Sequence, residues 1–259
     1  MKSLLVAAVA VAVTVASPAA AAPFTPTAAI SLLKSEIPGR LIDVIGVVPG
    51  MTADEAREVL AATYAPDDIR LREQGYRMGK DNVWVETTPF PVEVSVDDFM
   101  RSTGDTFSAK LTGLAGDNKV VVATRKVKFP ESGGPTEDTL HAAVIEKYGT
   151  PSFSIDGRFY VWQFKDGQLV PCTNRGGDVC NRPAQSYDYI RGQEASPVDY
   201  VILVQIEEGG YWQANPRWMT TTVSDMKLIN EAAFADFNAL KTEWDRLNAV
   251  TAPVAAPKL

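Results

Sequence analysis

The chain has 259 residues and carries 25 lysine and arginine residues against 32 aspartate and glutamate residues, a formal net charge of −7. An acidic chain without a basic run is a poor candidate for nucleic-acid binding, because that affinity depends on cationic contacts with phosphate, so we expect no nucleic-acid partner. The single histidine, His141, leaves little room for a Ser-His-Asp or Cys-His hydrolase or for a histidine-rich zinc site, and we predict no metal and no cofactor.

Residues 1–21 have the three-part pattern of a secretory signal peptide. A short positive region at Met1-Lys2-Ser3 precedes an apolar stretch from Leu4 to Val15, and Ala19-x-Ala21 marks the expected cleavage site. The alternative, a membrane anchor, would need about 20 apolar residues, and no later segment of the sequence is long and apolar enough. The sequence therefore predicts a periplasmic or secreted protein without a transmembrane segment.

A first helix-plus-sheet unit is predicted over residues 22–130. We expect a short helix at 28–37 and then a strand at 41–48. Next come Thr52 and Glu55, which have the spacing of a capping box. They mark the start of a helix that ends before Pro66. Four alternating runs then predict strands at 83–86, 92–96, 107–114 and 120–129, the last two joined by a turn at Gly116-Asp117-Asn118.

A second unit is predicted over residues 131–224, with a helix from Thr136 to a glycine cap at Gly149. Four further strands are expected at 159–164, 168–171, 200–206 and 218–223, with a turn at Lys165-Asp166-Gly167. The helices match at an offset of 84 residues, Thr52 with Thr136 and Tyr64 with Tyr148, which favours a duplicated unit. The predicted fold class is α+β, with two tandem units of one helix and a four-stranded antiparallel sheet.

The two cysteines, Cys172 and Cys180, enclose a short glycine-bearing turn. In an oxidising compartment this spacing predicts a disulfide. Metal ligation and a reactive thiol are the alternatives, but a metal site would lack ligands even with His141 recruited.

A final amphipathic helix is predicted over residues 225–250, followed by a loose tail at 251–259. Its apolar residues recur every three or four positions, which favours docking on the sheets of the same chain. A homodimer through this helix is the alternative.

The stretch Val48-Pro-Gly-Met-Thr-Ala-Asp-Glu55 resembles the G-M-T-x-x-E helix start of small cell-envelope proteins, among them the small lipoproteins of the outer-membrane β-barrel assembly machinery. The doubled plan is also similar to the tandem repeats of the β-lactamase inhibitor protein. These resemblances imply a non-enzymatic binding module whose partner is another envelope or secreted protein, and they assign no individual residues.

Two regions contain more interface-type residues than folding requires. The first is the connection from Cys172 to Pro197, and the second is the hairpin tip that precedes Trp218, which we expect in the core. Tyrosine, tryptophan and arginine are enriched at interface hot spots, so the predicted binding residues are Arg182, Tyr187, Tyr189, Arg191, Tyr211 and Trp212.

No common catalytic motif occurs, and we predict that the protein is not an enzyme. One alternative is an envelope enzyme that uses paired carboxylates, and the adjacent pairs are Asp67-Asp68, Asp97-Asp98 and Glu207-Glu208. The other is a small-ligand carrier with a pocket between sheet and helices.

Two sheet faces are also predicted. The aromatic row of Tyr160, Trp162 and Phe164 is expected in the core. A basic sheet face is expected to be solvated, with Lys110, Thr112, Thr124, Lys126 and Lys128.

Overall fold

A computed structural model describes residues 22–29, 42–80, 83–98, 104–130, 132–172, 180–187, 196–208 and 216–251. Within them, the helices are α1 (Ala53–Ala61), α2 (Glu137–Tyr148) and α3 (Met226–Thr251), with a short 3₁₀ helix η1 (Pro66–Asp68). The strands are β1 (Ile69–Gln74), β2 (Arg77–Lys80), β3 (Val83–Glu86), β4 (Phe90–Asp98), β5 (Asp105–Leu111), β6 (Val120–Lys128), β7 (Phe153–Ile155), β8 (Phe159–Lys165), β9 (Gln168–Leu169), β10 (Tyr200–Glu208) and β11 (Pro216–Asp225). The predicted α+β class is confirmed.

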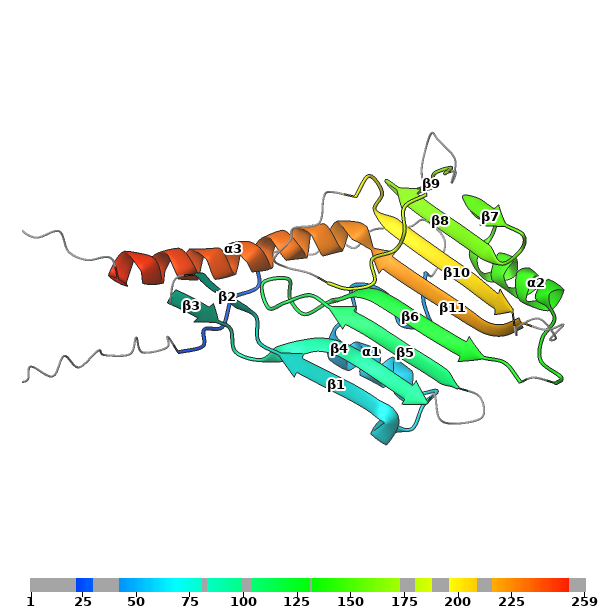
Figure 1. The fold of residues 1–259 in the computed structure, drawn as a ribbon, viewed down its shortest axis with the longest axis horizontal. Coiled ribbons are helices and arrows are strands. Elements are labelled where there is room, and N and C mark those ends of the chain that lie inside the picture. The colour runs from blue at the N-terminus through cyan, green and yellow to red at the C-terminus, as the bar shows by residue number, and fades with distance from the viewer. Residues whose placement is uncertain are drawn as a thin grey trace, which may run out of the picture.

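Most of the strands belong to one large antiparallel sheet (Figure 1). In the described residues its order is β1-β4-β5-β6-β11-β10-β8-β7, with β9 paired to β8, while β2 and β3 form a separate hairpin. The central pair, β6 and β11, joins a first group of strands that follows α1 to a second group that follows α2. Two separate four-stranded sheets are therefore not confirmed, because the last strands of the two groups hydrogen-bond to each other.

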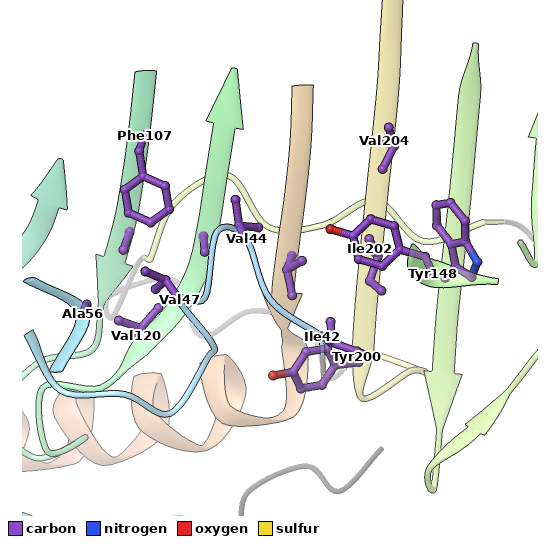
Figure 2. Close-up of a cluster of buried hydrophobic side chains, with 14 of the residues drawn as sticks. Ile42, Val44, Val47, Ala56, Phe107, Val120, Tyr148, Tyr200, Ile202 and Val204 are labelled. Atoms are coloured by element: carbon purple, nitrogen blue, oxygen red, sulfur yellow. The ribbon is translucent and has the colours of Figure 1, made fainter. Parts of the chain in front are cut away.

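Both α1 and α2 pack on the same face of this sheet (Figure 1). The main core lies between them and the sheet, and Figure 2 shows Phe107, Ile202 and Val204 pointing from the strands toward Val47 and Tyr148. The predicted aromatic row is part of this core, since Tyr160 and Trp162 are fully buried and Phe164 is 6% exposed. Most of this face of the sheet is thus occupied by packed side chains.

Local sequence signals place several element ends correctly. The capping box at α1 forms, with Glu55 N–H donating to Thr52 Oγ1 (3.2 Å) and Thr52 N–H donating to Glu55 Oε2 (2.7 Å). At α2 the Thr136 hydroxyl accepts the Thr139 N–H at 3.2 Å, and Gly149 follows that helix with a φ of 75°. The turn residues Asp117 and Asn118, and Asp166 with Gly167, all have positive φ, as tight hairpin turns require.

The strand predicted at 41–48 is wrong over its described residues. Val44 and Val47 exchange backbone hydrogen bonds across a tight turn, in which Ile45 and Gly46 have φ values of 51° and 85°. The Asp43 carboxylate accepts the Gly46 N–H at 2.7 Å and so favours the turn over an extended chain. Most of the predicted helix at 28–37 lies outside the described residues.

Further strand assignments also differ from the prediction. The run at 83–86 is β3, which pairs with β2 in the separate hairpin. The sequence did not predict β2, β7 or β1, and β1 lies at one edge of the large sheet. The burial pattern explains the miss, because five of the six residues of β1 are exposed and the alternation of apolar residues stops after Ile69 and Leu71.

The C-terminal helix packs on the same chain. Its stripe residues Met226, Ile229 and Leu240 are buried, and the helix lies against β2, β3, β6 and β10. The stripe that a homodimer seam would have used is therefore turned toward the same chain, with Phe237, Trp244 and Leu247 half-buried. No helix among the described residues has the length and apolar character to cross a membrane.

Candidate functional site

The face of the large sheet opposite α1 and α2 is polar, and Figure 1 views the sheet with α1 behind it. We call it the open face. Across four neighbouring strands, Ser95, Ser108, Thr124 and Thr222 lie opposite one another in register. A second row pairs Thr106, Lys126, Thr220 and Gln205, and a third pairs Lys128, Trp218 and Glu207. These rows define the open face, and α1 and α2 do not cover it.

One end of this side of the sheet is covered by other parts of the chain. On this side of the sheet, the apolar residues Val122, Val161 and Val201 form a second core cluster with Cys172 and Met226. The segment after the disulfide is tied down there, because Ser224 Oγ donates to the Ala184 carbonyl at 3.2 Å. The uncovered part is therefore the second and third rows, because Thr222 in the first row is only 7% exposed.

Trp218 lies on the open face, and three cations lie around its ring. The Lys126 ammonium lies 4.7 Å and the Lys128 ammonium 5.6 Å from the indole centroid, and the Arg217 guanidinium lies 6.0 Å from it. Cations over an aromatic face are held by its quadrupole. We call these four residues, Lys126, Lys128, Arg217 and Trp218, the basic-aromatic cluster.

The prediction that Trp218 lies in the core is wrong. Trp218 is half-buried and belongs to none of the buried clusters formed by the described residues. A sequence signal could have shown this, because Trp218 alternates in phase with Thr220 and Thr222, whereas Met219 and Val223 carry the apolar phase of the same strand.

The positive charge of this cluster is only partly balanced. Glu207, which is 51% exposed, contacts Lys126 at 3.8 Å. Within the described part of the chain, no carboxylate pairs with Lys128 or Arg217, and Arg217 Nε is buried without a hydrogen-bond partner. A buried donor of this kind is uncommon in folded proteins.

Elsewhere the predicted basic face is satisfied within the chain. The Lys110 ammonium donates to Glu93, which also accepts from Arg72 at 3.0 Å, and these two cations lower the pKa of Glu93 although burial opposes the change. Thr112 is fully buried and donates to the Gly116 carbonyl at 2.8 Å. The cation-rich part of the open face is therefore at Lys126 and Lys128.

The sequence-predicted binding residues are placed as follows. Arg182 is exposed, and Cys172 and Cys180 form the predicted disulfide, with their Cα atoms 4.8 Å apart. Tyr187 is half-buried and packs against two core clusters. The other predicted binding residues, Tyr189, Arg191, Tyr211 and Trp212, lie outside the described residues.

Tyr187 has a structural contact that the sequence does not reveal. Its hydroxyl donates to the Asp236 carboxylate at 2.5 Å, and that carboxylate also accepts backbone N–H groups from Gly113 and Ala115. Burial raises the pKa of Tyr187 well above its ordinary value, and the Asp236 charge adds to this. Tyr187 thus ties the connection after the disulfide to α3.

A cleft lies at the opposite face of the sheet, beside α1. It has a volume of about 470 Å³ and adjoins a smaller hollow of about 210 Å³ beside α2, both lined by Arg125 and Val127. Arg125 forms a bidentate ion pair with Asp105, and the Asp105 carboxylate also accepts a hydrogen bond from the Tyr64 hydroxyl at 2.9 Å. Burial first, and then the hydrogen bond to Asp105, raise the pKa of Tyr64 to about 12.

His141 has a partner in the adjoining strand. Its Nδ1 lies 2.6 Å from the hydroxyl of Tyr160, which also donates to the Gly157 carbonyl. These contacts tie α2 to the turn before β8. Among the described residues, no group of three or more histidine, cysteine, aspartate or glutamate side chains could hold a metal ion.

Comparison with protein families, with curated protein sequences and with solved structures finds no match to this chain.

Proposed function

We propose that this protein is a non-enzymatic protein-binding module of the cell envelope whose partner meets the open face at the basic-aromatic cluster. The observation that supports this is the position of Trp218, a large aromatic side chain held half-exposed among cations on an otherwise polar face. A solvated face of an antiparallel sheet is ordinary. A tryptophan there has no role in the core, and tryptophan and arginine are the residue types that dominate interface hot spots.

The open face also suits a partner because it is built on regular strands. Its hydroxyl-bearing side chains sit opposite one another in register, and Thr124 and Thr222 are already hydrogen-bonded to each other at 3.2 Å. A binding surface held by strands loses little conformational entropy when a partner docks. The predicted tip at Tyr211 and Trp212 is joined in sequence to the β11 end of this face.

The partner can be located by photo-cross-linking from the open face. A photoreactive residue at Thr220 is expected to capture one partner in envelopes of the source cells, whereas the same residue at Glu146, on the exposed side of α2, is not. Capture alone identifies a candidate, and the purified candidate is then titrated with the protein. The proposal fails if the candidate does not bind, or if it cross-links equally well from Glu146.

Trp84 offers a matched control for Trp218. It is 46% exposed on the β2–β3 hairpin, with the Arg77 guanidinium 4.3 Å from its ring centroid, but it lies outside the large sheet. Trp218→Ala is expected to weaken binding of the purified partner by about 30-fold, the loss typical of a hot spot. Trp84→Ala should leave it within about twofold, and equal losses would contradict the proposed surface.

Export and duplication are part of this proposal. The signal-peptide pattern at 1–21 and the disulfide support a periplasmic or secreted location. N-terminal sequencing of the mature protein should begin at Ala22.

The order of the helices and strands supports the proposed duplication. A threonine-capped helix precedes β1, β4, β5 and β6, and another precedes β7, β8, β10 and β11, with the last strand of each group at the centre of the sheet. The resemblance drawn from Gly50-Met51-Thr52 stays a prediction.

The cleft beside α1 favours a small-ligand carrier as the second candidate. Its volume of about 470 Å³ falls within the range of small-molecule sites. If the protein is a carrier, we expect the dye anilinonaphthalene sulfonate to bind, and we expect Val127→Trp, at a residue that lines both hollows, to weaken that binding. Thr220→Trp on the open face should not weaken it. The carboxylate enzyme has less support, because Asp105 in this cleft is already engaged by Arg125 and Tyr64.

A further inference from the structure

We infer that the partner presents an acidic protein segment to the basic-aromatic cluster, with its carboxylates on Lys128 and Arg217 and its apolar side chains on Trp218. This inference rests on the proposed function and adds the chemistry of the partner.

The charge of the cluster is opposite to that of the protein. Three cations, Lys126, Lys128 and Arg217, surround Trp218, and Glu207 is the carboxylate that contacts them in the described residues. The chain as a whole carries a formal charge of −7. An acidic partner is therefore repelled by most of the molecule and attracted at this place, which orients it during encounter.

Arg217 indicates the kind of acceptor that is missing. Its Nε is buried and has no hydrogen-bond partner, and a buried donor left unsatisfied carries a free-energy penalty. A carboxylate accepts from a guanidinium through two parallel hydrogen bonds, the strongest geometry that an arginine offers. Because Nε itself is enclosed by the chain, a partner carboxylate would accept from the terminal Nη groups of this half-buried side chain.

The dimensions of the cluster favour a short segment over a long polyanion. Lys126 and Lys128 are two residues apart on β6, which places their Cα atoms about 7 Å from each other, and Trp218 lies directly opposite Lys128 on β11. This arrangement accommodates two or three carboxylates around one apolar contact. A nucleic acid would need a longer cationic track and would be repelled by the rest of the acidic surface.

Three probes of defined charge test the inference. They are the blocked dodecapeptide (Glu-Glu-Tyr)₄, its neutral counterpart (Gln-Gln-Tyr)₄, and an oligothymidylate of eight phosphates. Titration calorimetry at low salt is expected to show binding of the glutamate peptide, at least tenfold weaker binding of the glutamine peptide, and affinity that falls as salt is added. Absence of glutamate-peptide binding, or tighter binding of the oligonucleotide, overturns the inference.

A matched pair of double variants locates the site. Lys126→Gln with Lys128→Gln is expected to weaken glutamate-peptide binding by at least tenfold, whereas Lys165→Gln with Lys227→Gln changes the net charge equally at two other exposed positions and should have less than a twofold effect. Circular dichroism checks that both variants fold. Equal losses in the two variants would show a response to net charge alone and would overturn the inference.

The inference and the proposed function can fail separately. A partner that cross-links from Thr220 and binds the Lys126/Lys128 variant with unchanged affinity supports the binding function and overturns the acidic-segment inference. Glutamate-peptide binding that is lost in that variant, with no protein captured from Thr220, leaves the anionic site standing without the proposed function.

Discussion

Asp236, buried in the middle of α3, accepts the hydroxyl of Tyr187 at 2.5 Å. The same carboxylate accepts three backbone N–H groups of the β5–β6 connection, from Gly113 at 2.7 Å, Ala115 at 2.9 Å and Gly116 at 3.3 Å. Burial raises the pKa of Asp236, and these hydrogen bonds partly offset that rise. One side chain thus joins the C-terminal helix, a hairpin of the large sheet and the connection that follows the disulfide.

Asp236→Ala is expected to destabilise the protein by about 3 kcal/mol or more, because it leaves several buried donors without an acceptor. Urea unfolding measures the loss. Asp245→Ala, an exposed position on the same helix whose ion pair with Lys241 is also exposed, should change stability by less than about 0.5 kcal/mol. Similar losses at the two positions would contradict the role of Asp236 as an anchor.

Gly113→Ala should displace the same carboxylate, since a Cβ atom at Gly113 would collide with it. We expect a loss of about 1–3 kcal/mol in the otherwise unchanged protein. In the Asp236→Ala background the added loss should be well below 1 kcal/mol, because the collision partner is gone, so the two changes are not additive. Additive losses in a double-mutant cycle of urea unfolding would refute this arrangement.

Replacing both Cys172 and Cys180 with alanine is expected to destabilise the protein by about 2–3 kcal/mol, the chain-entropy value for a loop of this length. Adding a reductant to the unaltered protein should produce a similar loss in thermal or urea unfolding. The variant itself should not respond to the reductant, and a response there would show that the effect does not come from this disulfide.

Tyr64 gives a pH-dependent prediction. Its pKa in the folded protein is raised from 10.0 to about 12, by burial first and by the hydrogen bond to Asp105 second. A raised pKa means that the folded state holds the proton more tightly, so this contribution to stability is complete below pH 10 and is lost between pH 10 and 12. The stability difference between the unaltered protein and Tyr64→Phe, followed by urea unfolding, should shrink over that range. A constant difference would show that Tyr64 does not titrate in this way.

The sequence by itself determined the features that arise within a few residues of chain. Thr52 and Glu55 specify the start of α1 because both partners of the capping box lie in one helical turn. Asp166 and Gly167 specify a turn because they tolerate positive φ. The spacing of apolar residues predicted α3 over nearly its full length, and the separation of Cys172 from Cys180 predicted their bond.

Only the tertiary structure decided how these pieces meet. The pairing of β6 with β11 turned two expected sheets into one, a choice between strand partners nearly 100 residues apart that no local pattern encodes. That pairing brings Trp218 opposite Lys128 and beside Lys126, which makes the candidate binding surface. Likewise the contact of Tyr187 with Asp236 joins residues 49 positions apart, and a tyrosine predicted as a binding residue is held inside the fold. Local propensity sets the elements, whereas side-chain packing and hydrogen-bond satisfaction across the whole chain decide which faces are covered and which stay open to a partner.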